Sequence, residues 1–519
     1  HYGRTSDHVL NAKLVLPNGE TLNTADEHSG AALRSTLTPL LQQHKAEIQK
    51  QSPDLPRGLT GYNLAKSVGK NCNLTYLLSG SEGTLGVVTE LTLKLTPLPE
   101  TKALLACFYP DFQSALEHGR ELLALKPTAI ETVDDNILTL AQDDEIYTHI
   151  EHLLPTNKTL GGLNLIEFVG AKAEVAQNIK RAQAAITQSK YPFSHVHATS
   201  AKDMTALWNL RKKGVGLLGN LPGKKRPVPF VEDTAVRPDQ LPEFITEFRA
   251  VLEKHGLRYG MFGHVDAGCL HVRPALDMAD AKDRALVPVI TEAIHQLVQK
   301  YHGILWAEHS KGYRSEYVEA YFGNVLYGVL RDIKTLFDPH NQLNPGKIAS
   351  SRTTNTPLVK VDAPTMRGKL DEHIDEAVKG LYEKAIFCNG NAACMNTQVD
   401  SVMCPSYKAT MNRVHSPKGR AMMLRAWLQS PTPDITQATY DALNGCLGCK
   451  ACASSCPVKV NIPDLKSEFL AAHHKKHRRP LRDWALYHLE NALNVGRKFP
   501  QISNALMQCA VGRAVMKGI

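Results

Sequence analysis

The feature that most constrains this chain is a run of four closely spaced cysteines, Cys446-Leu-Gly-Cys-Lys-Ala-Cys-Ala-Ser-Ser-Cys-Pro457. Its spacing, C-x2-C-x2-C-x3-C-P, is typical of a cubane iron–sulfur cluster. Zinc is the main alternative, but all-cysteine zinc sites use two separated pairs. Disulfides within so short a run would be strained, and buried structural cysteines need no such spacing. The run therefore predicts a [4Fe-4S] cluster in a protein that accepts or passes electrons.

The composition, with 43% hydrophobic and 21% charged residues, is that of a globular protein. A length of 519 residues predicts three or four domains. The sequence contains no apolar run long enough for a membrane span. Seven of the eleven cysteines lie between Cys388 and Cys456, which favours a reducing compartment. No signal peptide is visible, although the chain begins at His1, and we predict a cytoplasmic protein.

The net charge of +9 is modest, and the densest basic patch is His473-His-Lys-Lys-His-Arg-Arg479. Such a patch binds an anionic surface or is the solvated end of a helix. No aromatic residues interleave with it to stack on bases, so we predict no nucleic-acid partner. A peripheral contact with the cytoplasmic face of a membrane stays open as the alternative to the solvated helix end.

The first 99 residues look rich in strands. Val9–Val15 and the Pro-Asn-Gly turn after it predict a hairpin with residues 20–22. Residues 74–78 and 89–95 look like further strands. Between them lies Gly80-Ser-Glu-Gly-Thr-Leu-Gly86, whose glycines would let backbone N–H groups approach a phosphate or would form a plain tight turn.

Residues 100–350 repeat the order strand, helix, strand, which predicts two split βαβ units in a sheet with helices on one face. The expected strands are 103–108, 129–133, 163–169 and 193–197, and the expected helices are 112–125 and 172–188. A strand at 227–236, a helix at 238–255, a hairpin at 259–272 and a helix at 285–302 follow.

A second set of cysteines, Cys388, Cys394 and Cys404, precedes the first run. In paired-cluster modules the fourth cysteine of each run ligates the other cluster, and Asn391 stands where one cysteine of this set would be expected. Cys404 would then complete the cluster of Cys446, Cys449 and Cys452. Cys388, Cys394 and Cys456 would offer three thiolates, which leaves open a three-iron cluster, a non-cysteine fourth ligand or no second cluster.

Histidines and a carboxylate form a candidate metal site. His264 and His271 fall on the expected hairpin, and Glu308-His309 follows the apolar run 304–307. Such donors suit zinc or another borderline divalent ion, although isolated histidines beside apolar strands are more often core residues. A metal would bind an α-hydroxy carboxylate, and a neutral imidazole would take the hydroxyl proton. Arg211 is the candidate carboxylate clamp, or else part of a basic helix end.

Together these motifs resemble the fused FAD-linked and iron–sulfur D-2-hydroxy-acid dehydrogenases, in particular the large bacterial D-2-hydroxyglutarate dehydrogenase type. The resemblance covers nearly the whole chain. It rests on residues 80–90, 229–233, 263–271, 308–309, 337–346, 388–405, 415–420 and 446–457.

The resemblance implies FAD in a domain of the vanillyl-alcohol-oxidase type, held by Tyr62, Asn63, Gly80, Ser81, Glu82, Gly83, Thr84, Gly86 and Val87. It implies that His264, His271 and Glu308 ligate a divalent ion, with zinc favoured. His309 would be the base, and Arg211 would hold a carboxylate. Hydride would pass to the flavin, and electrons would leave through the cluster to a quinone or an electron-transfer protein rather than to oxygen.

The expected fold is α+β, with a partial flavin domain, an α+β substrate domain and a helical ferredoxin-like domain. The boundaries expected are 1–99 for the flavin part, 100–350 for the substrate domain, 351–385 for a linker, 386–480 for the iron–sulfur domain, and 481–519 for the helical start of a further domain.

The chain departs from this family in three ways. The glycine-rich pyrophosphate loop of an earlier flavin half and the cysteine-rich C-terminal domain are both missing, so we expect an internal portion of a longer protein. Arg273 stands where single-domain relatives carry Asn, which favours a second substrate carboxylate and hence 2-hydroxyglutarate.

D-lactate or glycolate oxidation and a non-catalytic electron carrier in a respiratory complex are the alternatives. The oligomeric state, including a homo-oligomer, is left open.

Overall fold

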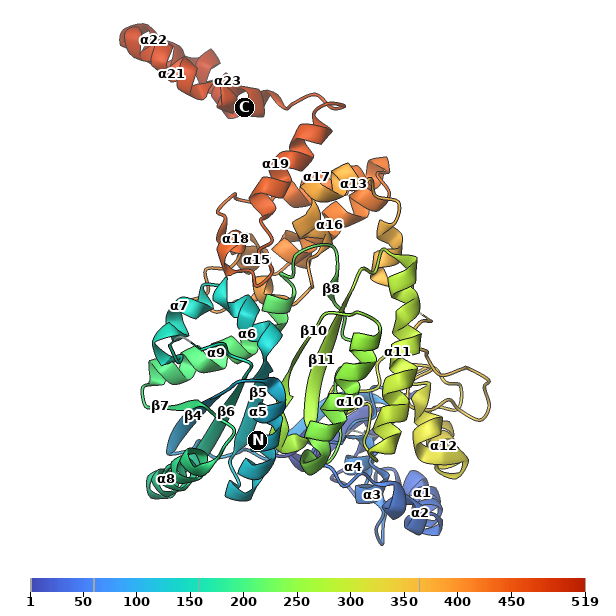
Figure 1. The fold of residues 1–519 in the computed structure, drawn as a ribbon. Helices are drawn as coiled ribbons and strands as arrows, with labels where there is room; N and C mark the ends of the chain where they lie inside the picture. Colours follow the sequence, from blue (N-terminus) through green and yellow to red (C-terminus); the bar gives the residue numbers. More distant parts are fainter. Residues whose placement is uncertain (1, 59–60, 157, 364, 519) are drawn as a thin grey trace. The chain divides into compact units, whose positions relative to one another are not determined.

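The computed structural model describes residues 2–58, 61–156, 158–363 and 365–518. The chain divides into two compact units, residues 1–372 and residues 373–519, and Figure 1 shows the elements of each. In the part of the chain that is described, no helix is both long enough and apolar enough to cross a membrane.

The first unit begins with a small sheet in which β1 (Val9–Val15) lies between β2 (Thr21–Asn23) and β3 (Val87–Leu93). The predicted hairpin of β1 and β2 is confirmed. The prediction that this region is mainly strand is wrong, because α1 (Ala31–Gln43), α2 (Lys45–Gln51), α3 (Leu64–Ser67) and α4 (Leu74–Leu78) separate β2 from β3.

Helix α4 replaces a strand that we expected at the same residues. Its leucines, Leu74, Leu77 and Leu78, are spaced as one face of a helix and are all buried. The Asn73 side chain accepts a hydrogen bond from the Tyr76 N–H and caps the first turn. The short apolar run therefore had the period of a helix rather than that of a strand.

A second, eight-stranded sheet forms most of the first unit, in the order β7-β4-β6-β5-β10-β11-β8, with β9 paired to β11. Strands β4 and β5 both flank β6, and β6 and β7 both flank β4. The strands are β4 (Thr101–Tyr109), β5 (Ala129–Asp134), β6 (Gly162–Gly170), β7 (Ser194–Ala198), β8 (Arg226–Pro227), β9 (Thr234–Ala235), β10 (Tyr259–His264) and β11 (Cys269–Leu276).

One expected strand is broken. Residues 227–236 contribute only the short strands β8 and β9, because Asp233 between them has a left-handed backbone with a φ of 72°. A strand cannot continue through that conformation. The break turns the backbone before β9, and the Asp233 side chain is fully buried there.

Helices cover both faces of the sheet, whereas we expected them on one. The first face carries α5 (Phe112–Leu122), α8 (Lys172–Gln188), α10 (Leu241–Lys254) and α11 (Ala281–Lys300). The second carries α6 (Asp135–Gln142), α7 (Ile146–Ile150) and α9 (Ala201–Leu218). Successive residues of β4, such as Leu104 and Leu105, enter different cores, so the strand is apolar throughout.

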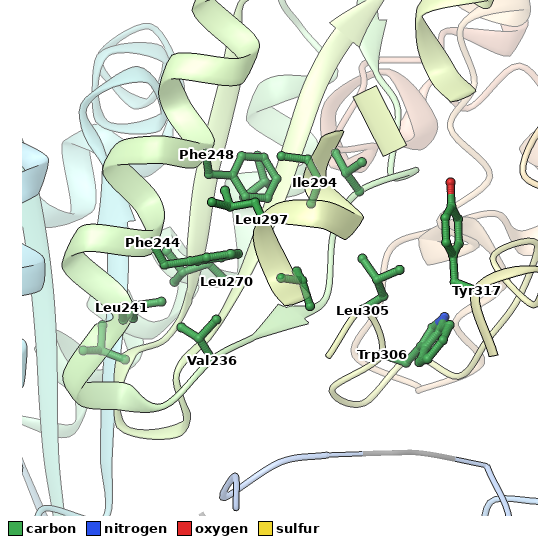
Figure 2. Packing of buried hydrophobic residues seen from close by; sticks show 14 of the residues in the cluster. Val236, Leu241, Phe244, Phe248, Leu270, Ile294, Leu297, Leu305, Trp306 and Tyr317 are labelled. Atoms are coloured by element: carbon green, nitrogen blue, oxygen red, sulfur yellow. The ribbon is translucent and has the colours of Figure 1, made fainter. Parts of the chain in front are cut away.

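The core on the first face supports the segment that leads to Glu308. Helices α10 and α11 lie side by side near β11 (Figure 1). Figure 2 shows Phe244 and Phe248 of α10 beside Leu297 of α11, and the two phenylalanine rings meet edge to face at 5.8 Å. Trp306 is buried in the same cluster. The next helix, α12 (Tyr317–Phe337), bends at Gly323.

The second unit contains helices and no strand among its described residues. Its helices are α13 (Glu376–Leu381), α14 (Glu383–Ile386), α15 (Pro405–Thr410), α16 (Pro417–Gln429), α17 (Pro433–Asn444), α18 (Ala451–Ser455) and α19 (Ile462–His473). Ser416 and Thr432 cap α16 and α17 with their side chains, each followed by a proline at the first helical position. This helical, ferredoxin-like region packs six of its cysteines in or against a small core of its own, whereas Cys449 is exposed.

Four short helices follow, α20 (Leu481–Tyr487), α21 (Leu489–Lys498), α22 (Pro500–Gln508) and α23 (Ala510–Gly518). They confirm the predicted helical segment as far as residue 518, and residue 519 lies outside the described residues. Most of their side chains that are described are exposed.

Candidate active site and electron-transfer site

The hairpin of β10 and β11 places the two predicted histidine ligands. Phe262 lies opposite His271, and His264 lies opposite Cys269. Gly268 makes the turn with a φ of 65°, and a Cβ there would come 1.9 Å from the Val236 carbonyl oxygen. Only glycine fits such a position, so the register that brings the histidines together is fixed by the turn.

The predicted metal ligands meet at one carboxylate oxygen. Glu308 Oε1 lies 3.1 Å from His264 Nε2 and 3.4 Å from His271 Nε2. A related set of four donor atoms within 4.8 Å of one another comprises Asp233, His271, Glu308 and His309. The structure therefore brings the segment after residue 304 to the two histidines of the β10–β11 hairpin.

The donor set fits a divalent ion. His271 Nδ1 is buried and has no hydrogen-bond partner among the described residues. His264 Nδ1 lies 2.6 Å from Glu131 Oε1, the kind of carboxylate contact that orients a metal-bound imidazole. Two imidazoles and a carboxylate are common ligands of zinc.

Contacts between these groups shift their pKa values. Burial alone would lower the pKa of His264, but hydrogen bonds to Glu131 and Glu308 outweigh it and raise that pKa to about 9. Burial likewise opposes the ionisation of Glu308, and the imidazoles of His264 and His271 nevertheless hold its pKa well below the usual value. A divalent ion would compete with these protons for the same atoms.

Asp233, which we did not predict as a site residue, supports Glu308 and His309 through the backbone. Its carboxylate accepts the N–H of Glu308 at 3.0 Å and the N–H of His309 at 2.8 Å. Its own backbone oxygen accepts the N–H of Ala307 at 2.9 Å. Asp233, whose backbone is left-handed, thus holds the three successive residues 307–309. In the sequence, only its position before an apolar strand indicated this role.

His309, the predicted base, stacks on His271 with a ring separation of 4.8 Å. Its side chain is 43% exposed, and Nδ1 lies 3.5 Å from Glu232 Oε1. The hydrogen bond with Glu232 raises the pKa of His309 above its ordinary value, although partial burial opposes the rise. His309 therefore has an accessible imidazole beside the candidate metal ligands His271 and Glu308.

Three arginines surround the cluster. Arg211 Nε donates to Glu131 at 3.0 Å, and Arg273 Nε donates to Glu232 at 2.7 Å. Arg57, which the sequence did not single out, donates to Glu308 Oε2 at 2.6 Å. The candidate site is accordingly rich in guanidinium groups that can bind carboxylates.

A cavity of about 840 Å³ lies next to the cluster and has Glu308 in its wall. This volume is within the range of cofactor and ligand sites, roughly 300–1,000 Å³. Tyr62, Asn63 and Gly80 of the predicted flavin-binding residues line it, together with Arg57. The other residues predicted for FAD are not in this wall, namely Ser81, Glu82, Gly83, Thr84, Gly86 and Val87.

The glycine-rich loop instead contacts the remainder of the first unit. Thr84 is buried, its hydroxyl lies 2.8 Å from the Tyr62 hydroxyl, and its carbonyl accepts Lys334 Nζ at 2.8 Å. Glu82 Oε1 accepts the backbone N–H of Lys311 at 2.9 Å. These contacts attach the loop to the residues that follow Glu308, while its role in FAD binding stays a prediction.

The second unit gathers the predicted cluster ligands. Cys404, Cys446, Cys449 and Cys452 line one small cavity together with Arg420. All eleven cysteines are free, so the disulfide alternative is excluded in this structure. Among the described residues, the group of side chains that could hold a metal ion, with ligand atoms within 4.8 Å of one another, contains no cysteine.

The other three cysteines lie near one another, because Cys388 and Cys456 both act on Cys394, and Cys404 lies near Cys394 as well. Burial raises the pKa of Cys394, and the neighbouring Cys388 and Cys456 add to the rise. The N–H of Lys418 donates to Cys394 Sγ at 3.3 Å. Asn391 stands where a cysteine was expected. Its side chain accepts a hydrogen bond from the Ala393 N–H at 2.9 Å and so stabilises the local turn.

Comparison with known proteins defines the class. Residues 98–348 match the C-terminal domain of FAD linked oxidases, and residues 384–460 match the 4Fe-4S dicluster domain. The chain thus combines the C-terminal domain of FAD linked oxidases with a 4Fe-4S dicluster domain, as we predicted. The matches support FAD and an iron–sulfur cluster as cofactors, whereas the divalent ion and the number of clusters stay predictions.

Within this class the chain is similar to D-2-hydroxyglutarate dehydrogenases. It is 41% identical to that of Pseudomonas putida over 98% of this chain and 56% of that protein. It is 37% identical to that of Escherichia coli (strain K12) over 97% of this chain and 55% of that protein. Glycolate oxidase subunit GlcD of Bacillus subtilis is 26% identical over 67% of this chain and 64% of that protein. The chain spans little more than half the length of the two dehydrogenases.

Proposed function

We propose that the protein is an FAD-dependent dehydrogenase that oxidises a D-2-hydroxy acid, with D-2-hydroxyglutarate favoured, to the 2-oxo acid. The observation that carries this proposal is the convergence of His264, His271 and Glu308, with His309 stacked beside them. The similarity to dehydrogenases of this name supports the choice of substrate.

The residues of the site have distinct roles in this proposal. His264, His271 and Glu308 hold a divalent ion, zinc being favoured, which when bound lowers the pKa of the substrate hydroxyl. His309 accepts the hydroxyl proton, because its ring is partly exposed and lies beside the Glu232 carboxylate. Arg211 binds the carboxylate beside the reacting carbon, and Arg273 binds a second one. FAD, next to this site, supplies the acceptor for the hydride.

We propose for the flavin and electron-transfer parts the domain boundaries that the sequence suggests. We place FAD in a domain of the vanillyl-alcohol-oxidase type that includes residues 1–99, with Tyr62, Asn63 and the glycine-rich loop in contact with it. The substrate domain is 100–350, the linker 351–385, the iron–sulfur domain 386–480, and a further helical region starts at 481. The terminal acceptor is a quinone or an electron-transfer protein, and the eleven free cysteines support a cytoplasmic location.

The clusters are assigned by their thiolates. Cys404, Cys446, Cys449 and Cys452 hold one [4Fe-4S] cluster. Cys388, Cys394 and Cys456 form a second site with three thiolates, which suits a three-iron cluster. Iron analysis tests this assignment, because two clusters give about seven iron atoms per chain and one cluster gives about four.

The test of the function is the spectrum of the full-length protein before and after anaerobic addition of substrate. We expect flavin bands that D-2-hydroxyglutarate bleaches at a lower concentration than D-lactate or glycolate does. Preferred bleaching by one of those monocarboxylates would move the assignment to that substrate. Iron–sulfur absorbance without flavin would instead identify an electron carrier.

A further inference from the structure

Two buried glutamates each contact one arginine and one histidine of the candidate active site. The first is Glu131 of β5, whose side chain is 3% exposed. It lies directly across the sheet from His264, so its Oε1 reaches His264 Nδ1 at 2.6 Å. Its other oxygen accepts Arg211 Nε at 3.0 Å. A residue on the sheet thus fixes both a proposed metal ligand and the proposed carboxylate clamp.

Glu232 makes the same kind of contacts, with one arginine and one histidine, on the other side of the β10–β11 hairpin. Its side chain is mostly buried, Oε2 accepts Arg273 Nε at 2.7 Å, and Oε1 lies 3.5 Å from His309 Nδ1. Arg314 Nη1 donates to the Glu232 backbone oxygen at 2.6 Å and holds the residue in place. One carboxylate therefore fixes the proposed base together with the second arginine.

The two arginines share one aromatic ring. The guanidinium carbons of Arg211 and Arg273 lie 4.6 Å and 5.9 Å from the centre of the Phe262 ring. Each arginine uses Nε for its glutamate, and the terminal nitrogens of both form no hydrogen bond with the described residues. Those terminal nitrogens are the edge of a guanidinium that binds a carboxylate with two parallel hydrogen bonds.

We infer that Glu131 and Glu232 are positioning residues that fix the separation of the two guanidinium groups and so select a dicarboxylic 2-hydroxy acid. A planar guanidinium held at Nε cannot rotate freely, so its outer edge keeps one direction. In this arrangement each edge takes one carboxylate of a dicarboxylate, whereas a monocarboxylate leaves one arginine without a partner. This inference rests on the proposed function and adds the residues that determine its specificity.

The test uses the full-length holoenzyme with Glu131→Gln and Glu232→Gln, since glutamine keeps the shape of glutamate and removes the charge. Glu243→Gln is the matched control, because Glu243 also pairs with an arginine, Arg120 at 2.8 Å, away from the site. Calorimetry measures the binding of 2-oxoglutarate and of pyruvate as dicarboxylate and monocarboxylate probes. Metal content, FAD content and melting temperature are recorded for every variant.

We expect Glu232→Gln to weaken 2-oxoglutarate binding about tenfold or more and pyruvate binding much less, with normal metal and FAD content. Glu131→Gln should weaken both probes and lower metal affinity about 10- to 100-fold, since His264 loses its carboxylate partner. Unchanged preference for the dicarboxylate in both variants overturns the inference. So does equal weakening of both probes by Glu232→Gln with loss of FAD and of melting temperature, which marks a structural role.

A double variant separates positioning from folding. If Glu232 acts through Arg273, Glu232→Gln combined with Arg273→Gln should bind 2-oxoglutarate no more weakly than Arg273→Gln alone. Additive losses would overturn the inference. Failure of the proposed function is recognised independently, because the unmodified enzyme would then neither bind 2-oxoglutarate nor oxidise D-2-hydroxyglutarate.

Discussion

The histidine cluster of the first unit and the cysteine cluster of the second unit are built in opposite ways. Three of the four thiols at the cavity, Cys446, Cys449 and Cys452, come from one stretch of seven residues. Glu131 lies more than a hundred residues before His264 and Glu308 in the sequence, and the eight-stranded sheet places it beside His264 on the neighbouring strand. Local spacing specifies the cysteine site, whereas strand register specifies the histidine site.

The difference predicts how each region responds to substitution. A local site depends on its own ligands, so losing one thiolate removes the cluster and little else. A site made by sheet register depends also on partners such as Glu131 and Asp233, which hold the ligands without touching substrate. The following predictions test that contrast.

The largest effect is expected from Cys449→Ala. The variant should lose about four iron atoms per chain and the cluster absorbance, because a cubane needs its four thiolates. Transfer of electrons to the external acceptor should become undetectable, while substrate still bleaches the flavin. Cys509→Ala, at an exposed cysteine outside the cluster region, is the control. If both variants kept their iron, the assignment of Cys449 would be wrong.

His309→Ala should reduce the rate of flavin reduction by about 10²- to 10⁴-fold, the usual contribution of a general base. Iron and FAD contents should be normal, since the contacts described for the His309 ring are with His271 and Glu232. Stopped-flow absorbance at the flavin band measures the rate. Retention of the full rate would remove His309 from the chemistry.

Removal of the divalent ion by a chelator should lower turnover about a hundredfold, as expected for the loss of several kcal/mol of electrostatic stabilisation. The cluster spectrum should not change, because the ligands of the two sites lie in different units. Added zinc should restore activity, which metal analysis and turnover check together. An enzyme indifferent to chelation would contradict the ligand assignment of His264, His271 and Glu308.

A smaller effect concerns acid stability of the sheet unit, away from both sites. His118 is buried, and burial lowers its pKa to about 4. The unfolded chain therefore binds a proton that the folded chain excludes, and stability falls as the pH drops from about 6.5 towards 4, by roughly 1–3 kcal/mol. His118→Gln should flatten this dependence in thermal melts across that pH range. His149→Gln, at an exposed position, should leave the slope as it is.

The sequence predicted the parts of the molecule that local patterns determine. Helix 172–188 and the hairpin with His264 and His271 are confirmed, because their periods and turn residues are visible in short windows. The strand expected at 227–236 is wrong, because the left-handed backbone of Asp233 has no local signal. Glu131 and Glu232 were missed as site residues for a related reason. The buried Glu131 becomes informative only when its partner across the sheet is known, and Glu232 only when its contacts with Arg273 and His309 are known.

The backbone contacts of Asp233 link two residues of the proposed mechanism. One carboxylate holds the N–H groups of both Glu308 and His309, so a shift of either residue displaces its neighbour. Under the proposed roles, a change at Glu308 that altered the acidity of the substrate hydroxyl would also displace His309, the proposed proton acceptor. A change at Arg211 or Arg273 would alter substrate preference without acting on this pair, so the two properties can vary separately.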